Sequence, residues 1–535
     1  MTRTDRYLLP VALFLLLLAS YVQFLSANAA DKNWLLLAAR MLVSGKKLYT
    51  DIFEINPPLI VWLYTAPVWI SEHLTFLKDY NVLTLLGFAL IALVIGISMR
   101  LIALHPAFAQ EKKKQQTFAL LLAYIFIFFT APMYFFDREH ILLVLTFPYV
   151  LRFAPAIARQ PLPLCMRLVI GLLGAVGFCI KPHAIILFAL LQLLYLLRER
   201  SFAILVSIEN LIIYVLGGAY IASIVFTMPE YLHTVLPMAM ATYSAYSRKL
   251  SGIYSIVTFI VIMGITFADF RPRHASPMRR EVYYFLGVCV GYLAYALANN
   301  GWSYTYNPLI SIARFMAGWV MLEFLWLKHD HELRGLPSKP FLFGARACGF
   351  NLFMNAVFYL LIFSSYFFTF DCEHTLSCRS DRIFMREAKQ YHPHSFGMMS
   401  LEFGKGSELA RETEGSWDTR FNHLWMLPKF ILSNPDFTRQ NQWIIDYVGN
   451  AYAQDLERWK PEILYIDASP VFFGKQPYFD LIAYYGAVPA FQKAWAHYQH
   501  AGVIDACLPP PPDDPKSKGV QFDCRFDVYS RVTPP

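Results

Sequence analysis

The chain has 535 residues, of which 56% are hydrophobic and only 16% are charged, and its mean hydropathy is +0.40. Soluble domains carry about a quarter charged residues, so this composition excludes an ordinary soluble enzyme and predicts a polytopic α-helical membrane protein. The net charge of +8 does not indicate nucleic acid as a partner. Its basic residues fall in short clusters between apolar segments, as they do in the cytoplasmic loops of membrane proteins.

Eleven segments are apolar enough to be membrane spans, which need roughly 20 residues each. Two of them, 168–181 and 184–197, are short, and would equally form a broken pair that reaches only part of the way across. With the N-terminus inside, every basic cluster between the spans falls on the cytoplasmic face. The predicted spans are 8–25, 80–104, 117–135, 139–158, 168–181, 184–197, 202–226, 251–268, 282–297, 309–327 and 345–368.

The first predicted outer loop, residues 26–79, differs from the rest of the chain. Asp31 follows the first span almost directly. Residues 58–74 are apolar enough to span, but that placement would put Lys112 to Lys114 outside. We therefore predict two amphipathic helices on the outer surface, over 34–43 and 58–74. The other polar candidates of this loop are Tyr49, Asp51 and Glu54, ahead of Pro57-Pro58.

The residues before Asp31 are also similar to a secretory signal. Arg3 and Arg6 precede an apolar run that ends in Ala27-Asn28-Ala29, a small-x-small cleavage pattern. Cleavage would leave Asp31 close to a new N-terminus, whereas the alternation of basic clusters needs only an uncleaved first helix. Both alternatives place Asp31 on the outer face.

After the last predicted span, residues 371–535 are polar and long enough for one soluble domain, which we expect to be α/β and extracytoplasmic. We predict strands over 462–467 and 526–529 and a helix over 480–500. Four cysteines in this domain indicate disulfides, and a metal site is the weaker interpretation because there is no Cys-x-x-Cys pair. Of the three connectivities, we favour the local pairs Cys372–Cys378 and Cys507–Cys524.

Two further outer loops contain ionisable residues beside apolar helices, where charge is costly and usually functional. The first contains Asp137, Arg138, Glu139 and His140 in succession. The alternative there is a helix N-cap at Asp137 with a boundary ion pair. The second contains Lys181, which suits a phosphate group or snorkels at a helix end. The remaining outer-loop candidates are His183, Arg248, Trp302 and Tyr304.

Asp31 in the first outer loop, followed by amphipathic helices and Tyr49-x-Asp51 to Pro57-Pro58, resembles the GT-C superfamily. These integral-membrane glycosyltransferases use polyprenyl-phosphate-linked sugars, and include protein O-mannosyltransferases, lipid A aminoarabinose transferases and bacterial arabinofuranosyltransferases. Many members have a lysine before the double proline, where this chain has Asn56. The resemblance covers residues 1–370, with 371–535 as a separate domain.

The resemblance implies an inverting glycosyltransferase of a bacterial cytoplasmic membrane, with its C-terminal domain in the periplasm. A polyprenyl-phosphate-linked sugar would be the donor, and a glycan, lipid or protein the acceptor. Asp31 would be the catalytic base, with Asp137 or Glu139 as the second acidic group. The residues implied in binding substrate are Arg138, His140, Lys181, His183, Tyr49, Asp51, Glu54, Arg248, Trp302 and Tyr304.

Asp137, Glu139 and Glu54 could hold a divalent cation as a cofactor. Their spacing does not indicate a metal site, so the question stays open. Two other classes of function stay open beside the glycosyltransferase. The first is a transporter or flippase of lipid-linked sugars, and the second is a non-catalytic envelope assembly protein that binds through residues 371–535.

Overall fold

The computed structural model describes residues 5–25, 30–246, 253–269, 279–299, 302–333, 376–468, 479–507 and 524–532. Most of the described residues are helical. It divides into two compact units. Unit 1 comprises Met1–Ala27, Phe76–Ser223 and Ser247–Phe363, and unit 2 comprises Asn28–Thr75, Ile224–Tyr246 and Ser364–Pro535.

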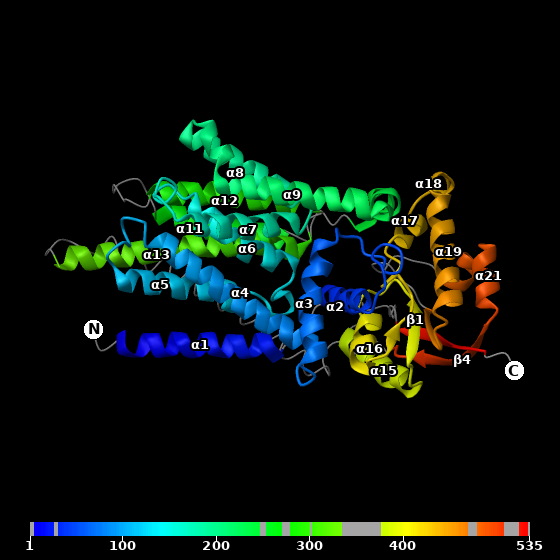
Figure 1. The fold of residues 1–535 in the computed structure, drawn as a ribbon. Helices are drawn as coiled ribbons and strands as arrows, with labels where there is room; N and C mark the ends of the chain where they lie inside the picture. Colours follow the sequence, from blue (N-terminus) through cyan, green and yellow to red (C-terminus); the bar gives the residue numbers. More distant parts are fainter. Residues whose placement is uncertain are drawn as a thin grey trace. The chain divides into compact units, whose positions relative to one another are not determined.

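Unit 1 is a bundle of long helices that run roughly alongside one another (Figure 1). Because most of their residues are apolar, these helices can pack on one another along their whole length. A π-helical turn, Tyr124–Phe128, continues α5. The α-helices of the bundle are α1 (Asp5–Leu25), α4 (Asp79–Ile102), α5 (Lys112–Ala123), α6 (Arg138–Arg152), α7 (Leu164–Cys179), α8 (Ala184–Glu199), α9 (Ile208–Thr227), α11 (Ile253–Asp269), α12 (Arg279–Ala298) and α13 (Asn307–Leu333).

Each of the first ten predicted spans coincides with one of these helices, but the prediction of eleven membrane spans is not supported. Among the described residues, four helices are long and apolar enough to cross a membrane, or five if Pro10–Leu25 and Ala30–Val43 together form one span. Helix α5, for example, ends at Ala123, and a π-helical turn and a 3₁₀ turn take up much of the rest of the span predicted over 117–135. The eleventh predicted span, 345–368, lies outside the described residues.

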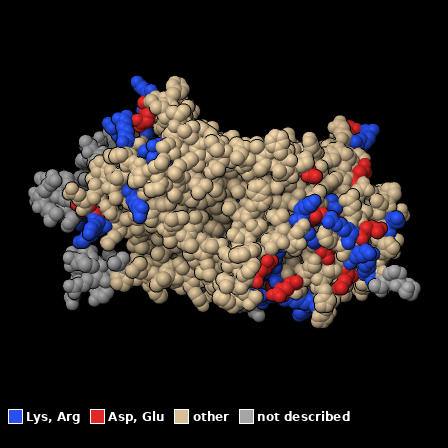
Figure 2. Space-filling model, in the orientation of Figure 1, with Lys and Arg blue, Asp and Glu red and all other residues tan. Residues whose placement is uncertain are grey.

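Basic residues near the ends of unit 1 helices form ion pairs with acidic residues of neighbouring helices. Arg159, after α6, pairs with Glu199 at the end of α8 at 2.9 Å. Arg167 in α7 pairs with Glu209 in α9 at 2.8 Å. Figure 2 shows charged side chains gathered where α8 and α13 end, with almost none along the visible flanks of the bundle. Apolar flanks with charge confined to the ends are typical of a helical membrane protein.

Small residues allow the helices of unit 1 to approach closely. A Cβ atom built on Gly287 of α12 would lie 2.9 Å from Leu194 of α8, and one on Gly177 of α7 would lie 2.8 Å from Thr146 of α6. Close approach at small residues is a common way for helices to pack in membranes.

Unit 2 contains two helices from the first predicted outer loop and the C-terminal α/β domain. Helix α2 (Ala30–Val43) begins four residues before the predicted start at Trp34, and α3 (Leu59–His73) matches the predicted helix over 58–74. The two pack against each other, and α2 also packs on α16 (Lys405–Thr413). The other α-helices of unit 2 are α10 (Leu236–Thr242), α15 (Leu376–Gln390), α17 (Leu427–Leu432), α18 (Pro435–Gln440), α19 (Gln442–Arg458), α20 (Leu481–Gly486) and α21 (Pro489–Trp495).

A five-stranded sheet forms the centre of the α/β domain, in the order β2-β1-β3-β5-β4. Strands β2, β1 and β3 are parallel, whereas β5 is antiparallel to β3 and to β4. Helix α15 packs on one face through Phe384, and α21 packs on the other through Trp495 (Figure 1). The strands are β1 (Ser395–Met399), β2 (Ser416–Trp417), β3 (Ile463–Asp467), β4 (Tyr498–Asp505) and β5 (Arg525–Arg531).

Both predicted strands are confirmed by β3 and β5, but the single helix predicted over 480–500 is wrong. Two short helices, α20 and α21, stand there, and β4 begins at Tyr498. Pro489 starts α21 at its first residue, since a proline lacks the N–H that would continue the preceding helix.

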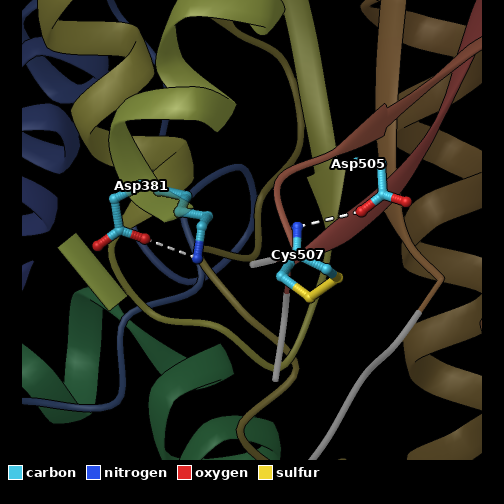
Figure 3. The surroundings of a disulfide bond; sticks show 5 residues. Asp381, Asp505 and Cys507 are labelled. Carbon is cyan, nitrogen blue, oxygen red and sulfur yellow. Dashed lines mark hydrogen bonds and ion pairs between the residues drawn. A yellow bond between two sulfur atoms is a disulfide. The ribbon is translucent and has the colours of Figure 1, made fainter. Parts of the chain in front are cut away.

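The predicted disulfide Cys507–Cys524 is present and joins the end of β4 to the start of β5 (Figure 3). Beside it, the Cys507 backbone N–H donates to Asp505 at 3.1 Å. Lys405 and Asp381 form an ion pair nearby at 2.8 Å. The other predicted pair, Cys372–Cys378, includes a residue outside the described part of the chain.

Candidate functional site

Asp31 lies in the first turn of α2, directly after Ala30, and its residue is half-buried. A carboxylate in the first turn interacts favourably with the positive end of the helix dipole. Asp31 belongs to unit 2.

Glu54 has a structural role in unit 2. The Trp34 indole N–H donates to Glu54 Oε2 at 2.6 Å, and the Asn56 backbone N–H donates to Glu54 Oε1 at 2.8 Å. The Asn56 side-chain amide also donates to Oε1. The carboxylate thus links α2 to the turn before α3. Its buried position leaves it little access to a sugar.

Tyr49 and Asp51, predicted to bind substrate, hold the same loop together. Tyr49 adopts a φ of 68°, donates its hydroxyl to Asn56 O at 2.8 Å, and packs its ring on Tyr231. Asp51 accepts from the Lys47 backbone N–H at 3.0 Å and from Arg458 of α19 at 2.6 Å. Both side chains are therefore engaged within unit 2.

An open groove of about 500 Å³ lies between α2 and α3 in unit 2. Trp69 on its wall is 56% exposed, which is unusual for such a large apolar side chain. The groove is lined by Leu42, Val43, Thr65, Ala66, Trp69 and Ile70. Since α2 rises about 1.5 Å per residue, Asp31 lies roughly 16 Å along the helix from Leu42. An apolar chain that occupied the groove would therefore be within one helix length of a carboxylate.

In unit 1, the four consecutive ionisable residues begin α6. Asp137 is its N-cap and accepts from the His140 backbone N–H at 2.8 Å. His140 Nδ1 accepts from the Phe136 backbone N–H at 2.9 Å. The capping alternative for Asp137 is therefore what the structure contains. Arg138, Glu139 and His140 are all buried.

Glu139 and Lys181 form a buried ion pair between α6 and the turn after α7. Tyr295 of α12 lies 3.5 Å from the same Glu139 oxygen, and Lys181 Nζ lies 5.2 Å from the ring centroid of Tyr304. Three residues selected separately from three predicted outer loops thus form one cluster, Glu139, Lys181 and Tyr304. Because Glu139 neutralises the ammonium, Lys181 would contact a phosphate only as part of this pair.

The remaining predicted residues lie around this cluster or outside it. Trp302 stacks on Tyr304 with ring centroids 6.3 Å apart, and Tyr134, at the end of the span predicted over 117–135, lies 6.1 Å from the Tyr304 ring. His183 follows Lys181 in the same turn, where burial lowers the pKa of its imidazole. Arg248 lies outside the described residues.

Two aromatic partners of the cluster, Tyr134 and Tyr295, were not predicted. Tyr295 lies inside a predicted span, where a tyrosine is most simply interpreted as part of the apolar core. Tyr134 lies in Pro132–Tyr134, a single 3₁₀ turn ahead of the ionisable residues. Its position next to them was the available signal.

Neither a metal-binding group of side chains nor a known relative adds a functional assignment to these residues. In the described parts of both units, no group of three or more His, Cys, Asp or Glu side chains is arranged to hold a metal ion. No protein family and no curated protein matches this chain.

Proposed function

We propose that this protein is a membrane glycosyltransferase that moves a sugar from a polyprenyl-phosphate donor to an acceptor hydroxyl at the outer face of the bacterial cytoplasmic membrane. The acceptor would belong to an envelope glycan, lipid or protein. Helices of unit 1 would hold the protein in the bilayer, and unit 2 would carry the reacting groups and stand in the periplasm.

One observation carries the proposal most directly: α2 has a carboxylate in its first turn and an apolar groove beside its last turn. A polyprenyl donor has the matching chemistry, with a long apolar chain and a polar sugar phosphate at one end. Helices with an apolar face can lie in the membrane interface, where such a chain is accessible. The groove would take isoprene units and Asp31 would act at the polar end.

The reaction needs a base and a stabilised leaving group. The acceptor oxygen would attack the anomeric carbon, Asp31 would take the hydroxyl proton, and the bond from the anomeric carbon to the phosphate oxygen would break. Polyprenyl phosphate would leave with the bonding electron pair. A cationic group that is already positioned near the phosphate would stabilise this charge.

The test is transfer by purified protein reconstituted in lipid, using polyprenyl-phosphate-linked sugars and a membrane extract as acceptor. Asp31→Asn should lower the rate by about 10²- to 10⁴-fold, the range typical for loss of a general base. Glu72→Gln, at an exposed carboxylate on α3 of the same unit, is the matched control and should keep the full rate. Full activity of Asp31→Asn in properly inserted protein would refute the assignment.

A transporter or flippase of lipid-linked sugars is the second candidate, favoured by the buried Glu139–Lys181 pair inside the helix bundle. Ionisable residues within a membrane bundle often mark a transport path. A transporter would move the lipid-linked sugar across a vesicle membrane without consuming it. In that case Asp31→Asn would have a mild effect, and Glu139→Gln would stop the movement.

A further inference from the structure

The α/β domain of unit 2 has a reversal of strand order of the kind that creates ligand sites. From β1 the chain passes through α16 to β2 on one side, while β3 lies on the other side of β1. Where parallel strands diverge in this way, loops leave the carboxyl edge in opposite directions and ligands bind between them. That edge follows Met399 of β1 and Asp467 of β3.

Three segments bring polar groups to this carboxyl edge. Ser400 follows β1 and donates its hydroxyl to Asp467 at the end of β3 at 2.8 Å. The chain after β2 continues beside β1, because the Leu424 backbone N–H donates to Ser400 O at 2.8 Å. That contact places Asn422 and His423 at the same edge. Asn422 also donates its side-chain amide to Phe403 O, in the loop between β1 and α16, at 3.1 Å.

Two side chains at this edge have a buried polar atom without a hydrogen-bond partner in the described structure. Asn422 is only 5% exposed, and its Oδ1 accepts no hydrogen bond from any residue in the described ranges. His423 is half-buried, and its buried Nδ1 likewise has no partner there, although its ring packs against Phe403. A buried polar atom without a partner costs about 1–3 kcal/mol, and a ligand that donates hydrogen bonds would remove that cost for both atoms.

The charges at the edge decide what kind of ligand fits. Glu402 accepts from the backbone N–H groups of Gly404 and Lys405 at 2.8 and 2.6 Å, so a carboxylate of the chain already occupies the N-terminus of α16. Lys405 is paired with Asp381. A phosphate or other anion would therefore meet Glu402, whereas a neutral group that donates hydrogen bonds would find Asn422 Oδ1.

The edge also lies next to the proposed catalytic base. A Cβ atom built on Gly404 would lie 3.2 Å from the Cβ of Ala30, so the start of α16 packs directly on the start of α2. Asp31 is the next residue along α2. The loop from the carboxyl edge to α16 therefore leads to the start of α2 within unit 2.

We infer that the carboxyl edge formed by Ser400, Asn422, His423 and Asp467 binds a neutral saccharide, whose hydroxyls donate to these buried acceptors. Phe403, half-buried beside His423, supplies an apolar surface for a sugar ring. The inference rests on the proposed function in one respect: the bound saccharide is the acceptor glycan, held with its reactive hydroxyl toward Asp31.

The experiment measures binding of soluble neutral oligosaccharides of glucose, galactose, mannose and arabinose, each alone, to full-length protein in lipid nanodiscs. Calorimetry should detect saturable binding of at least one. His423→Phe keeps the ring contact and breaks no hydrogen bond within the described residues, so the protein should fold normally. Affinity should fall by about tenfold, the effect of one lost hydrogen bond. Asn422→Leu should weaken binding similarly.

Thr419→Val is the matched control. Thr419 is as deeply buried as Asn422, and its Oγ1 also has no partner in the described residues, but its methyl group faces Gly397 in the middle of β1, away from the carboxyl edge. This variant should bind with unchanged affinity. No binding of any oligosaccharide, or equal binding by His423→Phe and wild type, would overturn the inference. So would binding that EDTA abolishes, because a bound cation would then be the ligand.

Transfer activity separates this inference from the proposed function. Asp31→Asn should still bind the oligosaccharide while losing transfer. Binding without any transfer by wild type would leave the saccharide site standing and refute the glycosyltransferase. Transfer without binding would refute the saccharide site alone.

Discussion

Arg458 donates a hydrogen bond to the Asp51 carboxylate at 2.6 Å, although 407 residues separate them in the chain. A second contact, from Lys46 to Asp418 at 3.0 Å, joins the same two regions. The Phe53 backbone N–H also donates to Arg420 O at 2.8 Å. The loop between α2 and α3 is therefore part of the α/β domain, and the residues that resemble a glycosyltransferase motif are held by its helices and strands.

The two arginines of this junction should differ sharply in their effect on stability. The Arg458 side chain is 60% exposed, so Arg458→Met should lower the free energy of unfolding by about 0–1 kcal/mol. Arg420 and Asp455 are both buried, and Arg420→Met would leave Asp455 without its ion pair, at a cost of about 3–5 kcal/mol. Urea unfolding of full-length protein, followed by tryptophan fluorescence, measures both. Equal losses of stability in the two variants would contradict the description of one ion pair as exposed and the other as buried.

Breaking the buried Glu139–Lys181 pair should destabilise unit 1 more by single than by double substitution. Lys181→Met leaves the Glu139 carboxylate buried beside Tyr295, and should cost about 3–5 kcal/mol. Adding Glu139→Gln removes the uncompensated charge and should recover most of that loss. Thermal unfolding in nanodiscs gives the comparison, and a double variant less stable than Lys181→Met would show that the pair is not coupled in this way.

A methyl group added at Gly449 should destabilise the α/β domain although alanine favours helices. A Cβ atom there would lie 2.6 Å from Val488 Cγ2, and a stiff β-branched side chain cannot move aside easily. We expect Gly449→Ala to cost about 1–3 kcal/mol, as overpacking does. Gly486→Ala, in α20 with no atom within 4 Å of its added Cβ, is the control and should be neutral or stabilising. Chemical unfolding of the two variants checks the difference.

Acid should destabilise the α/β domain through His423. Burial lowers the pKa of His423 to about 3, below the usual 6.5, so between these values the unfolded chain binds a proton that the folded chain does not. The free energy of unfolding should thus decrease as the pH is lowered through that window, by at most about 1.4 kcal/mol per pH unit. Burial raises the pKa of Glu402 above 4.5, and this carboxyl opposes the trend as it takes up its proton.

The difference between wild type and His423→Phe, measured from pH 7 to pH 5, isolates the contribution of His423, because both proteins contain Glu402. His423→Phe cannot bind a proton, so its stability should depend less on pH than that of the wild type. Identical pH profiles would show that His423 is accessible to protons in the folded state.

Hydropathy predicted the helices of unit 1 well because apolar runs bounded by basic clusters have a direct physical cause in the bilayer. Its count of eleven spans is not supported, since α5 ends at Ala123 although the apolar segment runs to residue 135, and α7 has only 16 residues where a span needs roughly 20. Turn residues between helices can be as apolar as the helices themselves. The length of each helix is consequently the property that hydropathy determines least.

The candidate site was predictable only in its parts. Local sequence singled out Glu139 and Lys181, but their pairing depends on how α6 and α7 pack, which no spacing in the sequence specifies. The resemblance to glycosyltransferases implies substrate-binding roles for Glu54 and Asp51. In the structure they accept hydrogen bonds from Trp34 and Arg458, which are 20 and 407 residues away, and the second separation is beyond any local pattern.

Unit 2 is assembled from the segment after α1, a short segment after α9 and the C-terminal part of the chain. During synthesis at about 5–20 residues per second, the loop around Asp51 waits roughly 20 to 80 s before Arg458 exists. Until then, α2 and α3 have exposed apolar faces and no α/β domain to cover them. In the proposed membrane location, the lipid surface would be the nearest partner of matching chemistry, so the nascent protein would depend on the membrane before its own fold is complete.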